Sequence, residues 1–92
     1  MNGNMDDQYR EMVNFTRALT AFNERLRNSL RDLEQHHDRV SPHWQDEMRR
    51  HYDQQWEPFR QTIKHYNAVE GPSYVEFLHI KAEATRRFLE GG

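Results

Sequence analysis

The 92-residue sequence contains no cysteine. A disulfide, a thiolate zinc site and a thiol nucleophile are therefore excluded within this chain. Glycine and proline are also scarce, with four and three residues. No apolar run reaches the roughly 18 residues that a membrane-spanning helix needs. The sequence is thus a polar chain with few helix-breaking residues, and it fits a reducing compartment.

Neither sign of charge dominates the chain. Thirteen Lys and Arg residues oppose 15 Asp and Glu residues, which leaves a formal net charge of -2. Proteins that bind nucleic acid usually carry a basic face or stripe, so we expect no nucleic-acid partner. The first residues, MNGNMDDQYREM, are polar and acidic and do not resemble a signal peptide. We expect a cytoplasmic protein, or one secreted without a cleavable signal peptide.

Motifs of common enzymes are missing from the sequence. It has no G-x-S-x-G, no P-loop and no dinucleotide-binding fingerprint. The carboxylates stand at helical spacing from basic residues, as Asp53 does from Arg49 and Arg50, which is typical of ion pairs within one helix. A thin helical protein also offers little cavity for a substrate. We therefore expect no enzymatic activity and no cofactor.

The first half of the chain has the periodicity of one long amphipathic helix. The pattern predicts this helix over about residues 7–39, with no internal glycine or proline. At 1.5 Å per residue it would be about 50 Å long, so its apolar stripe needs a partner of similar length. The stripe consists of Met12, Phe15, Leu19, Phe22, Leu26, Leu30, Leu33, His37 and Val40.

A second helix is predicted over about residues 42–69. Ser41 is a good N-cap residue, and Pro42 suits the first helical position. The apolar pattern stays in phase on both sides of Pro58, which predicts a kink there and not an end. The short connection predicts that the two helices are antiparallel neighbours. The face expected to meet the first helix consists of Trp44, Met48, Tyr52, Trp56, Phe59, Ile63 and Tyr66.

The segment NAVEGPS predicts the end of this helix near Val69. Ser73 and Glu76 have the spacing of a capping box, which predicts a third helix over about residues 74–90. The sequence thus predicts one all-α domain, residues 1–92. It is a long antiparallel helical hairpin with a shorter third C-terminal helix packed against it.

Six histidines raise the question of a metal site. His43, Glu47 and His51 are spaced by four and would share one side of the second helix, where imidazoles and a carboxylate could bind zinc. The same row fits the solvated flank of a helix, and the H-E-x-x-H motif is absent. We expect no metal and keep these three residues as the alternative. His37 falls within the apolar stripe, so we expect it to be hydrogen-bonded at the edge of the contact between the two helices.

The large apolar residues point to a protein partner. Tryptophan and tyrosine are enriched at interface hot spots, which favours Trp44, Tyr52 and Trp56 as contacts, although each could also complete the core. A third helix of about 17 residues spans only about 25 Å and would leave part of the first helix uncovered. We therefore add Phe15, Leu19 and Phe22 to the expected contacts. The partner would be a second copy, in a homodimer, or a small helical protein, in a heterodimer.

These features together resemble the WXG-type family of small helical hairpins exported by type VII secretion systems. The shared features are the length, the lack of cysteine, the long helix with its short turn, and a tryptophan at the start of the second helix, although the Trp-x-Gly motif reads Trp44-Gln45-Asp46 here. Tyr66 and Glu70 have the spacing of the family's Tyr-x-x-x-Asp/Glu export element. The resemblance implies a dimeric, secretion-associated protein without enzymatic activity. Two alternatives remain: an intracellular adaptor or immunity-type protein that sequesters one partner, and a histidine-based metal-binding protein or enzyme.

Overall fold

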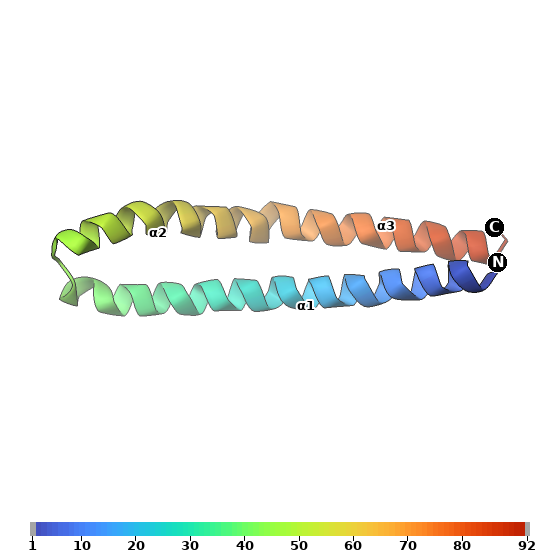
Figure 1. Cartoon of the computed structure of the whole chain (residues 1–92), viewed down its shortest axis with the longest axis horizontal. Coiled ribbons are helices and arrows are strands. Elements are labelled where there is room, and N and C mark those ends of the chain that lie inside the picture. The colour runs from blue at the N-terminus through green and yellow to red at the C-terminus, as the bar shows by residue number, and fades with distance from the viewer. Residues whose placement is uncertain (1, 92) are drawn as a thin grey trace.

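The structure is a computed structural model that describes residues 2–91, and it is a thin helical rod (Figure 1). The rod measures 65 × 17 × 16 Å, with a radius of gyration of 20.1 Å. A compact domain of this length would have a radius of gyration of about 12 Å. No strand occurs among residues 2–91, so the prediction of an all-α protein is confirmed. No helix in this part of the chain combines the length and the hydropathy required to cross a membrane.

The first arm of the rod is α1 (Asn2–Val40), followed at once by a 3₁₀ turn, η1 (Ser41–His43). The helix begins five residues before the predicted start at residue 7. It ends where Pro42 approaches, because a proline disfavours the α conformation of the residue before it.

The second helix does not begin at Ser41, so that part of the prediction is wrong. Trp44 has extended backbone angles, φ -131° and ψ 99°, and α2 (Glu47–His65) begins three residues later. Asp46 is the N-cap, and its carboxylate accepts a hydrogen bond from the Arg49 backbone N–H at 3.1 Å. Aspartate caps a helix as well as serine does. Asp46 has the further advantage that its carboxylate also accepts from the Trp44 indole, at 2.8 Å.

The second arm is continuous from α2 to the end of the described chain. Pro58 lies inside α2, which runs on to His65. A π-helical turn, η2 (Tyr66–Glu70), then leads directly into α3 (Gly71–Leu89). The predicted break near Val69 and the capping box at Ser73 are therefore wrong, and α3 extends the second arm.

The π turn explains why glycine and proline do not break the second arm. The Gly71 N–H donates to the carbonyl of Tyr66, five residues back, so the regular α ladder is already widened when the chain reaches Pro72. Proline has no N–H to donate to a helical carbonyl. Directly after a π turn this absence costs little, because the regular α pattern of hydrogen bonds is already interrupted there.

The two arms lie side by side, and both ends of the described chain lie at the same end of the rod (Figure 1). The first arm packs chiefly against α3. The contact, which we call the seam, uses residues in steps of four and three on both arms, and each is buried or half-buried. They are Met12, Thr16, Leu19, Asn23, Leu26 and Leu30 on α1, and Gly71, Val75, Leu78, Ala82, Thr85 and Leu89 on α3.

The seam differs from the predicted stripe at two important positions. Phe15 and Phe22 are 57% and 47% exposed, whereas the polar neighbours Thr16 and Asn23 are buried. The reason is the closeness of the arms: a Cβ atom added to Gly71 would lie 3.0 Å from Asn23 Nδ2. A phenylalanine would not fit at such a contact. The buried Thr16 hydroxyl has a hydrogen-bond partner in its own helix, because it donates to the Met12 carbonyl at 2.7 Å.

The core that results is thin. Among residues 4–91, Leu30 and Ala82 are the only apolar residues that are buried. Met48 and Phe59, predicted to face the first helix, are 65% and 49% exposed. This chain alone therefore leaves most of its large apolar side chains in contact with solvent.

Candidate functional site

The connection between the arms is held by one arginine. The Arg49 guanidinium donates to the Ser41 carbonyl at 3.0 Å, to the Ser41 hydroxyl at 2.8 Å and to the Trp44 carbonyl at 2.9 Å. Its Nε donates to the Asp53 carboxylate at 2.8 Å. A planar guanidinium can make several such bonds at once, which a lysine cannot. Arg49 thus ties the first turn of α2 to the end of the first arm.

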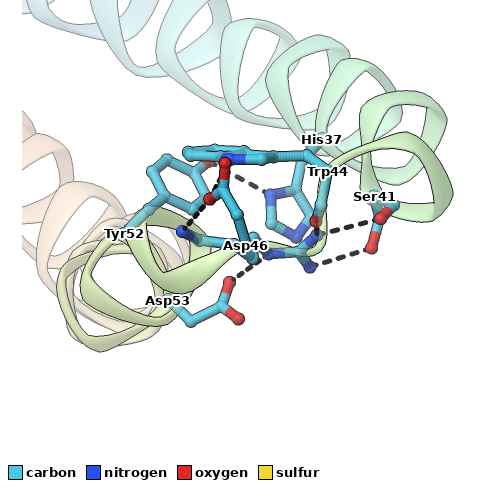
Figure 2. Close-up of polar contacts among 7 residues, drawn as sticks. His37, Ser41, Trp44, Asp46, Tyr52 and Asp53 are labelled. Carbon is cyan, nitrogen blue, oxygen red and sulfur yellow. Dashed lines mark hydrogen bonds and ion pairs between the residues drawn. The ribbon is translucent and has the colours of Figure 1, made fainter.

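Four rings gather beside this turn, and we call them the Trp44 cluster: His37, Trp44, Tyr52 and Trp56. Figure 2 shows His37, Trp44 and Tyr52 close together at the end of the rod. The His37 ring stacks on Trp56, with centroids 4.8 Å apart and planes inclined by 11°. His37 Nδ1 also lies 3.1 Å from the Tyr52 hydroxyl. The expectation of a hydrogen-bonded His37 at the edge of the contact between the first two helices agrees with this distance.

The cluster is preorganised and remains partly open to solvent. Trp44 packs against Tyr52, with ring centroids 5.1 Å apart, and its indole N–H is held by Asp46 at 2.8 Å. Trp44, Tyr52 and Trp56 are all half-buried, so each ring presents an edge or a face at the surface. Rigid aromatic rings that are already ordered lose little conformational entropy on binding another protein.

A network of charges joins the arms next to the cluster. Arg60 contacts Glu34 of α1 at 3.1 Å, and Lys64 lies 3.8 Å from the same carboxylate. On the outer side, the hydrogen bond from Gln61 and the charge of Arg60 lower the pKa of Glu57 below its usual value. These charges neutralise one another between α1 and α2. The groove beside them, lined by Glu34, Asp53 and Arg60 among others, therefore favours neither an anion nor a cation.

The predicted partner-binding residues lie in two separate regions of the molecule. Trp44, Tyr52 and Trp56 come together in the Trp44 cluster, as described above. Leu19 is half-buried in the seam, whereas Phe15 and Phe22 are exposed on α1. Phe22 is separated from His37 by 15 residues of α1, which is about 22 Å along the helix. The six residues therefore do not form one surface.

The predicted export element lies at the π turn. Tyr66 is half-buried, and its hydroxyl donates to Asn23 Oδ1 across the seam at 2.6 Å. The Glu70 carboxylate lies 3.8 Å from His65 Nε2 on the outside of the arm. Tyr66 thus contributes to the packing of the arms, whereas 44% of the Glu70 side chain is exposed.

The alternative metal site is not assembled in the structure. His43 lies in η1, ahead of the extended turn, whereas Glu47 and His51 lie in the first turns of α2. The expected common face required a helix that started at Ser41. Within the part of the chain that the structure describes, no three His, Asp or Glu side chains are placed to share a metal ion.

Sequence reasoning missed the role of Arg49. The pattern predicted only its ion pair with Asp53, and that pair is present at 2.8 Å. Its bonds to Ser41 and Trp44 depend on how the connection folds back over α2, and no spacing rule in the sequence indicates them. His37 carried a weak signal, as a histidine in an otherwise apolar stripe.

No family model, no curated protein and no solved structure matches this chain.

Proposed function

We propose that this protein is a non-enzymatic protein–protein interaction module. It would act as an antiparallel helical hairpin, with a shorter helix at the end of its second arm. One observation carries the proposal: the described chain buries almost none of its large apolar side chains, although nearly all of it is helical. Extensive exposed apolar surface on a protein usually marks an interaction site.

We further propose that the module is a WXG-like, secretion-associated protein. Support comes from the rod of two arms, from a tryptophan at the connection, and from Tyr66 and Glu70 on the second arm. The Trp44 cluster would be the contact for a second protein, because it offers ordered aromatic rings at an accessible end of the rod. Arginine and tryptophan are the residue types most enriched at energetically important contacts.

Export can be tested in a bacterium that has a type VII secretion system. A tagged chain is measured in the culture medium and in the cells, with the secretion ATPase present or deleted. We expect export that depends on the ATPase. The variant Glu70→Gln should reduce export, and Glu76→Gln, a matched change on the same arm, should not. Glu70 is preferable to Tyr66 for this test because Tyr66 also packs in the seam.

Partner binding can be tested in the same cells by placing a photo-crosslinking residue at Met48. Met48 is 65% exposed and lies one helical turn before Tyr52. We expect one discrete adduct with another protein, and its loss when Trp44 is changed to alanine. An adduct without export would leave the interaction part standing as an intracellular adaptor. If the chain is not exported and no adduct forms, the whole proposal is contradicted.

A further inference from the structure

The two flanks of the seam have very different compositions. On an α-helix, adjacent residues are about 100° apart, so the positions just before and just after each seam residue lie on opposite flanks. The positions after the seam are Val13, Arg17, Thr20, Glu24, Arg27 and Arg31, with Pro72, Glu76, His79, Glu83, Arg86 and Glu90. The positions before it are Glu11, Phe15, Ala18, Phe22, Arg25 and Ser29, with Glu70, Tyr74, Phe77, Lys81, Ala84 and Phe88.

The flanks of the two arms combine into two continuous faces. Because the arms run in opposite directions, the positions after the seam on both arms point to the same side. The structure bears this out, since Val13, Thr20 and Glu24 line one groove together with His79. The positions before the seam must then share the opposite side. We call that side the phenylalanine face, because all five aromatic residues of the two sets belong to it.

The aromatic residues of the phenylalanine face supply most of the area that a protein interface needs. Its five aromatic residues are 47–68% exposed. A buried aromatic side chain covers about 150–250 Å², so these five leave roughly 600 Å² available for contact. A typical stable interface buries about 800 Å² on each partner. Among the positions after the seam, only Val13 and Pro72 are apolar, and none carries an aromatic side chain of comparable size.

The order of residues on this face fits a second copy of the chain. On α1 the order is Glu11, Phe15, Ala18, Phe22 and Arg25, which is nearly symmetric about Ala18 except that the charge at one end is opposite to the charge at the other. Two copies that lie face to face in opposite directions therefore place Phe15 against Phe22 of the second copy. The same arrangement places Glu11 against Arg25 of the second copy.

The residues of the second arm are arranged about the same level of the rod as Ala18. Thr85 contacts Met12, and Gly71 lies next to Asn23, so Phe77 lies at about the level of Ala18. A two-fold symmetry axis at this level would place Phe77 against Phe77 of the second copy. It also brings Lys81 beside Tyr74 of the second copy, where an ammonium group over an aromatic ring is favourable.

From these observations we propose that the phenylalanine face binds the same face of a second copy of this chain, with the two copies antiparallel, in a four-helix dimer. The inference rests on the proposed function in that both treat exposed aromatic residues as protein contacts. It adds a surface separate from the Trp44 cluster. Two of its central residues, Phe77 and Lys81, are exposed in the single chain and are not seam residues, so each can be changed with the seam residues kept.

The mass of the purified protein in solution tests the dimer. Sedimentation equilibrium from about 1 µM to 1 mM should give twice the chain mass of 11.2 kDa at the upper concentrations. Phe77→Asp should give a monomer. The control Phe59→Asp changes a phenylalanine on α2 that is 49% exposed, against 67% for Phe77, and that is not one of the residues of the face; it should stay dimeric. Circular dichroism confirms that both variants remain helical.

A charge exchange tests the antiparallel arrangement of the two copies. Glu11→Arg and Arg25→Glu should each weaken the dimer about tenfold at low salt, and the double variant should recover most of that loss. Within one chain these residues are 14 positions apart, or about 21 Å, which is twice the screening length of about 10 Å at 0.1 M salt. Recovery must therefore come from contact between copies.

Several results would overturn the inference. They are a wild-type monomer at all concentrations, a Phe77→Asp dimer as strong as that of Phe59→Asp, and a double charge variant no stronger than the single ones. A wild-type monomer that is still exported and still cross-links through Met48 would remove this inference alone. If the protein forms the dimer but shows neither export nor the Met48 adduct, only the proposed function is contradicted.

Discussion

Replacing Arg49 by methionine should open the connection between the arms. Methionine has nearly the same helix propensity as arginine and a similar length, so the variant removes the guanidinium and little else. Four hydrogen bonds disappear: two to Ser41, one to Trp44 and one to Asp53. Only 17% of the Arg49 side chain is exposed, so solvent does not already compete strongly for these bonds.

The expected loss can be worked out from these contacts. A hydrogen bond contributes about 0.5–1.5 kcal/mol net, and more when one group is charged. The acceptors are near the surface and will be rehydrated in the variant, so about 0.5–1 kcal/mol for each is appropriate. The free energy of unfolding should therefore fall by about 2–4 kcal/mol. Small domains have about 5–15 kcal/mol in total, so this loss is large for a protein with so thin a core.

Urea unfolding followed by circular dichroism measures the change. The control is Arg50→Met at the next position, which is exposed and outside the hydrogen bonds that hold the connection, and it should change the free energy of unfolding by less than about 0.5 kcal/mol. Arg49→Lys keeps the charge but not the planar fork, so it should lose about half as much as Arg49→Met. Equal stability of the Arg49→Met and Arg50→Met variants would refute the role assigned to Arg49. Measurements at one protein concentration keep any association constant.

Three further predictions concern the two arms. Tyr66→Phe removes the 2.6 Å bond to the buried Asn23 and should cost about 1–2 kcal/mol in urea unfolding, whereas Tyr66→Phe in an Asn23→Leu background should cost much less. Pro58→Ala restores a donor inside α2 and should raise the free energy of unfolding by about 1–3 kcal/mol; an unchanged or lower value would mean that the chain needs the proline there. The pKa values of Glu57 and Glu83 are lowered, by a hydrogen bond from Gln61 and by hydrogen bonds from Arg86, respectively. A lowered folded-state pKa adds stability above the unfolded pKa, and this is lost as the pH falls through the folded value. Thermal midpoints should therefore decrease on acidification below about pH 4, and the Glu57→Gln, Glu83→Gln double variant should show a smaller decrease.

The helical class and the ends of the first and last helices could be read from local chemistry, but the start of the second helix and its junction with the third could not. Ser41 and Asp46 are both good caps, and the choice between them depends on contacts of Asp46 with Trp44 and Arg49 that exist only once the connection has formed. Likewise, Gly71 and Pro72 usually end a helix. Here the π turn keeps the arm continuous, and the missing Cβ of Gly71 permits close contact with Asn23.

The sequence by itself determined that the protein is helical and elongated and that its apolar residues recur at a helical repeat. These properties follow from the scarcity of glycine and proline and from side-chain spacing, which act locally. Only the tertiary structure decided which residues form the seam. Thr16 and Asn23 occupy positions for which Phe15 and Phe22 were predicted, because the arms approach too closely for a large ring. Packing distance between the arms is set by both arms together, so no reading of one helix alone could have found it.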